Sequence, residues 1–384
     1  SISMIFLPSV EISRVEFETD FKFLIGDNLY FLNDGDEDWE MKAMSTRTFD
    51  LATVEVAHVE DGYPLFDFYE LVVVHKERAY MWNYDEQRLY EGTSDAVGFQ
   101  WNEIPCTGEV PNIGISFGYK DDSTSYYCVI DSHDSDLHLY RLDLETKIWN
   151  RRQISDPDQT IADVFDKRPL RNAHWDSWIV GQCVHFLPAI SKAERSDIRI
   201  ENHLILDLNL LEWSRVEDTE DPTLHYRHAL FSYDKCLWSL GKRSDAEAKI
   251  LLFRLDAEKG KWIEIAVMNL DYKACSQLRE PIIAGSRVIF LSPCAARKID
   301  GSIIQQKLVY VLEIEPTLLD RAAVALSKDP HRVELARRNL PANILRDLVE
   351  RRIFPREVQD QNVEDDHEGK HEDDEVPFKR SRAE

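Results

Sequence analysis

The sequence lacks the features of a membrane protein and of a disulfide-stabilised protein. It contains no run of about 18 apolar residues, so we expect no membrane-spanning helix. Its apolar opening, SISMIFLP, has neither a basic flank nor a small-residue cleavage site and is not typical of a signal peptide. The six cysteines are scattered without a CxxC pair, which argues against a zinc site and favours free thiols in a reducing cytoplasm or nucleus.

Basic residues are also scarce. The chain has 46 Lys and Arg against 71 Asp and Glu, which gives a net charge of −25 at pH 7. Such a field repels a phosphate backbone unless a basic stripe overrides it locally, and we find no such stripe. We therefore expect no binding to nucleic acid. Hydrophobic residues make up 43% of the chain, which is enough for a sizeable folded core.

A repeat is the strongest signal that the sequence does contain. Three segments share an alternating apolar run, an Asp, a short polar stretch, a Trp and a second strand-like run: LHLYRLDLETKIWNRR (137–152), NHLILDLNLLEWSRV (202–216) and ILLFRLDAEKGKWIEI (250–265). Alternation with a period of two is typical of β-strands, and a polar interruption between two such runs is typical of a turn. Each segment is therefore predicted to be a β-hairpin.

The spacing of the tryptophans predicts how these hairpins assemble. Subtraction of their numbers gives intervals of 62, 48, 64 and 49 residues for Trp39, Trp101, Trp149, Trp213 and Trp262. A period of about 50 residues with little helix is typical of a β-propeller, in which blades bury their faces against one another around an axis. We expect the five tryptophans to pack between blades. A last strand pair at 288–291 and 307–314 brings the prediction to about six blades.

The repeat resembles the kelch family. One whole kelch repeat can be followed from Trp213 to Trp262, with the strand-like segment LFSYDKCLWSLG inside it. The glycine pair that is typical of kelch repeats is absent, and Leu240-Gly241 is the nearest equivalent. The resemblance implies a divergent, mainly β kelch propeller over residues 1–315. The other matching positions of this repeat are Pro222, Arg227, His228, Leu255 and Asp256.

Beyond Pro316 the pattern changes from strand-like to helical. Residues 316–354 are rich in Leu, Ala and Arg, which favour helices, and show no strand alternation. Thr317 can cap a first helix, and Pro341 suits the first position of a second one. We predict a two-helix module over 316–354, followed by an acidic disordered tail over 355–384.

The two predicted helices resemble the elongin-binding box and the cullin-2 box of von Hippel–Lindau-type and suppressor-of-cytokine-signalling-type proteins. Ala322 stands at the position where the elongin box has Cys or a small residue. Asn343 replaces the second Pro of the cullin-5 version, so cullin-2 is the closer match. The resemblance implies elongin B, elongin C and cullin-2 as partners. The elongin-binding positions would be Thr317, Leu318, Ala322 and Leu326, and the cullin-binding positions Leu340, Pro341, Ile344 and Leu348.

Kelch-domain-containing receptors that act with cullin-2 hold the C-terminal carboxylate of a client protein with arginines in propeller loops. By this resemblance, Lys242 and Arg243 are the first candidates for client binding, and Arg171, Arg227 and Arg279 are secondary ones. Guanidinium groups suit this task because they can bind a carboxylate in bidentate fashion.

These observations predict a client-recognition subunit of an elongin BC–cullin-2 RING ubiquitin ligase, itself without catalytic activity. The first alternative is a kelch interaction scaffold whose C-terminal helices only close the propeller. A propeller enzyme is the least favoured, because HExxH, GxSxG, Walker and GxGxxG motifs are all missing. We accordingly predict no catalytic residue, no metal site and no cofactor.

Overall fold

The computed structural model of the protein describes most of the β-rich part of the chain and short pieces of its C-terminal segment. The described residues are 4–7, 10–12, 22–34, 39–57, 71–94, 98–112, 114–121, 123–133, 136–155, 175–188, 203–215, 226–242, 249–256, 261–271, 279–297, 303–316, 321, 324–325, 340–344 and 346. Within these ranges, no helix is long and apolar enough to cross a membrane.

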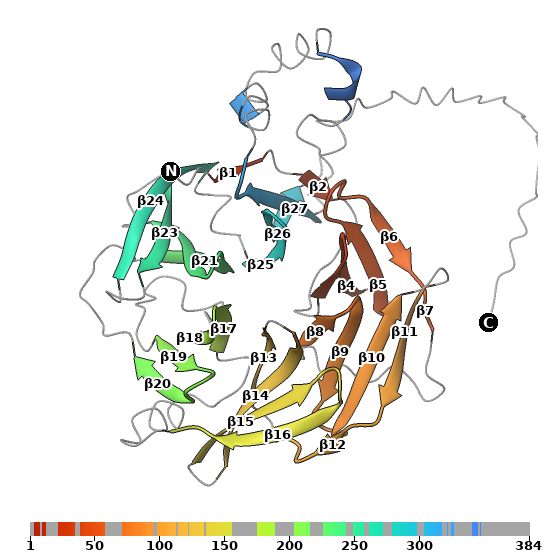
Figure 1. Ribbon diagram of the computed structural model, residues 1–384. Helices are drawn as coiled ribbons and strands as arrows, with labels where there is room; N and C mark the ends of the chain where they lie inside the picture. Colours follow the sequence, from red (N-terminus) through yellow and green to blue (C-terminus); the bar gives the residue numbers. More distant parts are fainter. Residues whose placement is uncertain are drawn as a thin grey trace, which may run out of the picture.

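Six sheets surround a central axis and form a six-bladed β-propeller (Figure 1). We number the blades in chain order. Blade 1 contains β3 (Lys22–Ile25), β4 (Asn28–Asp34), β5 (Trp39–Ser45) and β6 (Leu51–Val54). Blade 2 contains β8 (Val72–His75), β9 (Arg78–Asn83), β10 (Arg88–Ser94) and β11 (Phe99–Ile104), with β7 (Val56–Ala57) at its edge. Blade 3 contains β13 (Ile115–Lys120), β14 (Ser125–His133), β15 (Asp136–Asp143) and β16 (Ile148–Gln153), with β12 (Thr107–Gly108) at its edge.

Blades 4 and 5 follow the same order, with the first strand next to the axis and the last one at the rim, and blade 6 begins in the same way with its first strand next to the axis (Figure 1). Blade 4 contains β17 (Trp175–Val180), β18 (Cys183–Pro188), β19 (Leu204–Asp207) and β20 (Glu212–Arg215). Blade 5 contains β21 (Tyr226–Tyr233), β22 (Cys236–Lys242), β23 (Lys249–Asp256) and β24 (Lys261–Asp271). Blade 6 contains β25 (Arg279–Ala284), β26 (Arg287–Arg297) and β27 (Ile303–Glu313). The prediction of a mainly β chain with about six blades is confirmed.

Blade 6 takes its rim strand from the start of the chain. β1 (Ile5–Phe6) pairs antiparallel with β27, placing Phe6 opposite Leu312, and β2 (Val10–Ile12) continues along the same strand. The ring is therefore closed by hydrogen bonds between the two ends of the propeller sequence, which removes an exposed sheet edge. Nothing in the repeat pattern predicts β1, because it precedes the first copy of the repeat.

A side chain of blade 5 holds the closing strand in place. The amide oxygen of Asn269, on β24, accepts a hydrogen bond from the backbone N–H of Phe6 at 2.8 Å. The amide nitrogen of Asn269 donates to the Phe6 carbonyl, also at 2.8 Å. The side chain thus mimics a neighbouring strand and satisfies both backbone groups of Phe6.

The Leu-Asp…Trp pattern has a local explanation in the turn between the third and fourth strands. The carboxylate of Asp143 accepts hydrogen bonds from the backbone N–H groups of Glu145 and Thr146 at 2.7 and 3.1 Å. Asp207 does the same in blade 4, at 2.8 and 2.9 Å. This turn sets the strand register, because the Leu before each Asp then lies opposite the Trp that follows six positions after that Asp. The resulting pairs are Leu142 with Trp149, Leu206 with Trp213 and Leu255 with Trp262.

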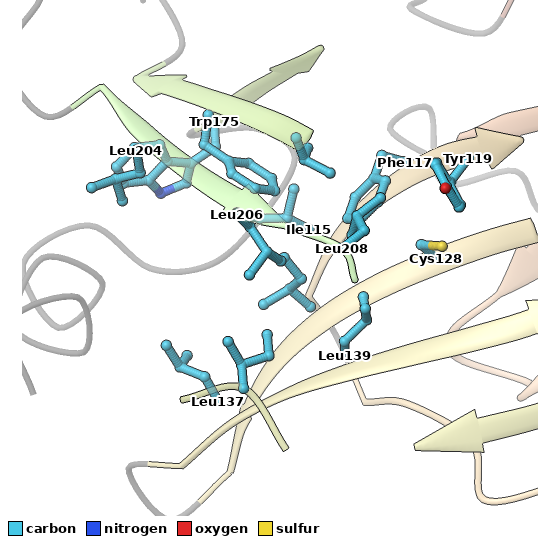
Figure 2. Packing of buried hydrophobic residues seen from close by; sticks show 14 residues of the cluster. Ile115, Phe117, Tyr119, Cys128, Leu137, Leu139, Trp175, Leu204, Leu206 and Leu208 are labelled. Carbon is cyan, nitrogen blue, oxygen red and sulfur yellow. The ribbon is translucent and has the colours of Figure 1, made fainter. Parts of the chain in front are cut away.

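Four of the five repeat tryptophans lie on rim strands and pack toward the preceding blade. Trp101 and Trp149 are 1% and 2% exposed, and Trp149 meets Trp82 of blade 2 edge-on with ring centroids 5.1 Å apart. Trp213 packs against the cluster between blades 3 and 4, and Trp262 against the cluster between blades 4 and 5. Figure 2 shows the first of these two clusters, built from the facing sheets of blades 3 and 4.

Trp39 differs from the other four. It begins β5, the third strand of blade 1, and lies opposite Asp34. The rim strand of blade 1 is LATV, which has no tryptophan. Trp39 is therefore not equivalent to the rim tryptophans, and the interval of 62 residues does not measure one blade.

The C-terminal segment is described only in part. Its helical residues are 321, 324, 325, 342–344 and 346. Val324, Leu340 and Ile344 are partly buried and pack against the apolar cluster between blades 6 and 1. The rest of the predicted two-helix module, and the whole of the predicted tail over 355–384, lie outside the described residues.

Candidate ligand-binding face of the propeller

The innermost strands of the blades all run in the same direction along the axis, so the ring has two distinct faces. We call the end at which the innermost strands begin the upper face, and the opposite end the lower face. The second strand of each blade, being antiparallel to the first, ends at the upper face. Loops at the ends of propeller strands commonly bind ligands, because several blades contribute side chains there.

Three of the five predicted client-binding residues belong to strand ends at the upper face of blades 5 and 6. Arg227 is the second residue of β21, and Lys242 ends β22, where it lies opposite Tyr226. Arg279 begins β25, the innermost strand of blade 6. The innermost strands of the two blades are neighbours in the ring, so the ring brings together positions 52 residues apart in the sequence (227 and 279). Arg171 and Arg243 lie outside the described residues.

A second polar cluster lies at the same face, on blade 3. Arg151 contacts the carboxylate of Glu109, and its other terminal nitrogen lies 2.9 Å from Nε2 of His138. Asp131, which is buried, accepts a hydrogen bond from the backbone N–H of Asn112 at 3.2 Å. The Arg151 guanidinium is therefore held by partners within its own blade, and its charge serves to order this edge of blade 3.

The lower face carries a chain of polar contacts that resembles the connectivity of a catalytic triad. Nδ1 of His75 lies 3.0 Å from Oγ of Ser125, and Nε2 of His75 lies 3.1 Å from a carboxylate oxygen of Glu145. Lys76 donates to the same carboxylate oxygen at 2.6 Å. The hydrogen bonds from Lys76 and then from His75 lower the pKa of Glu145 to about 2.

The burial of these side chains indicates that their contacts hold two blades together and do not form a nucleophilic site. Ser125 and His75 are 5% and 8% exposed, whereas Glu145 faces solvent. A nucleophilic Ser must present its hydroxyl to a substrate, and here the hydroxyl is the innermost member of the chain. The contacts join the first hairpin of blade 2 to the outer turn of blade 3, which fixes the angle between the blades.

Two histidines form a buried pair inside blade 4. Nδ1 of His185, on β18, lies 2.9 Å from Nε2 of His203, the residue before β19. The two residues are 3% and 1% exposed, and burial lowers the pKa of His185 to about 4. One neutral ring can donate its N–H to the other, so the pair satisfies polar atoms that the core would otherwise leave without hydrogen bonds.

Four of the cysteines are free thiols in the structure: Cys106, Cys128, Cys183 and Cys236. Cys128 is fully buried, and burial raises its pKa to about 12, so it behaves as a small core residue. Cys106, Cys183 and Cys236 are half-buried and also free. Cys294 belongs to β26, and Cys275 lies outside the described residues. Among the described residues, His, Cys, Asp and Glu form no group of three that could hold a metal ion.

The structure describes only some of the predicted elongin-binding and cullin-binding positions of the C-terminal segment. Thr317, Leu318, Ala322, Leu326 and Leu348 lie outside the described residues. Leu340 and Ile344 pack against the propeller, as described above, whereas Pro341 is exposed. The two apolar cullin-box positions that can be followed therefore face the propeller.

Comparison with known proteins gives no family. No family model matches the chain, and no curated protein matches it either. Solved structures that resemble it include YjhT, at 10% identity and a TM-score of 0.46 over 77% of this chain and 95% of that one. An oligogalacturonate lyase in complex with manganese has 10% identity and a TM-score of 0.40, over 82% and 98% of the two chains. A chain of RAG in complex with one melted and one unmelted RSS has 12% identity and a TM-score of 0.41, over 80% and 99%. We base neither the fold nor a function on similarity this distant; the propeller assignment rests on the strand pairing.

Proposed function

We propose that the protein is the client receptor of an elongin BC–cullin-2 ubiquitin ligase and has no catalytic site of its own. The observation that carries the proposal is the order of the sequence. Patterns that resemble an elongin box and then a cullin-2 box follow directly after β27, the strand of blade 6 with which the closing strand β1 pairs. A receptor of this kind raises the rate of ubiquitin transfer by proximity, since it holds a client lysine near the charged ubiquitin carrier.

The positions of Arg227, Lys242 and Arg279 at one face support a client with a free carboxylate. These are three cationic positions on strand ends of neighbouring blades, in a chain whose net charge is −25. Bidentate hydrogen bonds from guanidinium groups distinguish a carboxylate from an amide, because an amide carries no charge and accepts at only one oxygen. The proposed ligand is therefore the C-terminus of a protein.

Two experiments test the two halves of this proposal. The full chain should co-purify elongins B and C with cullin-2, and Leu318→Asp should abolish this while Ala342→Asp, at an exposed position outside both sets of predicted contact residues, should not. In a display of peptides with free or amidated C-termini, the full chain should select only free ones, and Arg279→Glu should remove the selection. Retention of elongin C by folded Leu318→Asp would show that the box assignment is wrong.

A second candidate function is a protein-binding scaffold without a role in ubiquitin transfer. The packing of Leu340 and Ile344 against the propeller favours it, because side chains used for closure need no external partner. A full chain that selects free C-termini but co-purifies neither elongins nor cullin-2 would favour the scaffold.

A further inference from the structure

The ring has one seam, at which it is closed without a peptide bond. The seam is the pairing of β1 with β27 inside blade 6. The apolar cluster between blades 6 and 1 adjoins it, because this cluster contains Leu7, directly after β1, and Val309 and Val311 of β27. Arg287, the first residue of β26, and Ser286 in the turn before it both donate to the carboxylate of Glu313, at 2.9 and 2.6 Å. Arg287 also donates to the carbonyl of Thr46 in blade 1, at 3.2 Å. The apolar members of the cluster are Leu7, Leu29, Phe31, Met44, Phe49, Ile282, Ile289, Val309 and Val311.

The described part of the C-terminal segment is two-sided with respect to this seam. Val324, Leu340 and Ile344 are partly buried and pack against the seam cluster. Their described neighbours in the sequence are exposed, namely Arg321, Ala325, Pro341, Ala342, Asn343 and Arg346. The side chains on the cluster are all large and aliphatic, whereas the exposed ones are small or polar. This is the arrangement of a segment that docks on the propeller.

We infer that the C-terminal segment is a clasp over the seam of the ring, and that the clasp hides the apolar face through which the protein would recruit a cullin. The inference rests in part on the proposed function, because Leu340 and Ile344 are also the apolar positions of the cullin-box pattern. One side chain cannot be buried in the seam and in a partner groove at the same time. Recruitment therefore requires the clasp to leave the propeller.

Competition for the same side chains has a reciprocal consequence. If a partner binds only the released segment, the partner weakens the seam by the same factor by which the seam weakens partner binding. Masking therefore weakens the binding of the partner without preventing it. A client bound at the upper face would change this balance only if it binds the released and the docked states with different affinities.

Hydrogen exchange of the full chain tests the clasp. Ile344→Asp should raise exchange in the seam strands β1, β4 and β27 roughly tenfold, while leaving the strands of blade 3 unchanged. Ala342→Asp introduces the same charge at an exposed position two residues away and should have no effect. Where Ile344→Asp does not fold, Ile344→Ala should give the same pattern with a smaller change. Unchanged exchange in the seam strands of both Ile344 variants would overturn the clasp.

The same measurement with purified elongin B, elongin C and cullin-2 tests the masking. Addition of the complex to the unmodified full chain should raise exchange in β1, β4 and β27, because binding removes Leu340 and Ile344 from the seam. Binding that leaves the exchange of these strands unchanged would overturn the masking. Failure of the complex to bind, with the seam still loosened in Ile344→Asp, would overturn the proposed function and support the clasp alone.

Discussion

Asn269 offers a direct test of how the ring is closed. Its side chain is the described contact through which blade 5 satisfies both backbone groups of Phe6 in the closing strand β1. Asn269→Ala removes both hydrogen bonds and leaves the backbone of Phe6 without these partners, although the side chain of Phe6 stays buried at 2% exposure. The change therefore isolates the polar contribution to closure from the apolar one.

The expected magnitude follows from the two bonds. Each net hydrogen bond contributes about 1 kcal/mol to stability, so we expect a loss of about 2 kcal/mol. For a domain of this size that corresponds to a fall in Tm of about 4 °C. Asn269→Asp should destabilise the protein at least as much as Asn269→Ala. A carboxylate can accept from the Phe6 N–H, but it has no proton to donate to the Phe6 carbonyl.

Thermal unfolding and hydrogen exchange measure this together. Asn269→Ala should lower Tm and speed exchange at the Phe6 and Leu7 amides, because the pairing of β1 with β27 opens more often. Leu210→Ala, at an exposed position of a blade 4 turn, serves as the control and should change neither quantity. A variant Asn269→Ala with the Tm and the β1 exchange of the unmodified chain would refute the assignment of Asn269 as a clamp on the closing strand.

Three further predictions concern the buried polar and aromatic groups. The pKa of His185 is about 4 in the folded chain against an ordinary value of 6.5, so the unfolded state binds more protons between pH 4 and pH 6.5. The free energy of unfolding should therefore be highest above pH 6.5 and fall by about 3 kcal/mol as the pH is lowered toward 4. His185→Gln, which does not titrate, should flatten this part of the Tm–pH curve, and an unchanged curve would contradict the prediction. Arg287→Ala should lower the free energy of unfolding in urea by about 3–5 kcal/mol, because it removes the cation paired with the Glu313 carboxylate, which is 4% exposed. The double change Arg287→Met with Glu313→Leu should recover most of this loss. A small loss in Arg287→Ala would argue against a buried ion pair. Trp149→Ala should cost about 3–5 kcal/mol by leaving a cavity between blades 2 and 3, and Trp262→Ala less because Trp262 is only partly buried; equal losses would speak against the packing described.

The hairpins were predictable because their determinants are local. Asp143 and Asp207 fix their turns through hydrogen bonds to residues two and three positions later, so a short stretch of sequence carries the whole signal. The local pattern also explains why the prediction for Trp39 was wrong. Trp39 follows a polar stretch as the others do, but the turn that feeds the rim strand of blade 1 comes after Ser45 instead.

The closing strand and the polar contacts between blades were not predictable in this way. Ile5 pairs with Glu313, and no period in the sequence relates the first residues of a chain to its last strand. His75 belongs to blade 2, whereas Ser125 and Glu145 belong to blade 3, so the spacing of His75 from the other two in the sequence carries no information about the distances between their side chains. For Arg227, Lys242 and Arg279, the residue type suggested a role, and the topology supplied their shared face.

Closure by the first strand has a consequence for the synthesis of the chain on the ribosome. Phe6 emerges from the ribosome about 300 residues before its partner Leu312. At roughly 5–20 residues per second, β1 waits on the order of 15–60 s before its neighbour exists. During that interval its apolar residues and unpaired backbone are open to other strands, including those of neighbouring nascent chains. The brevity of β1, only two residues long, limits this exposure and makes premature pairing weak.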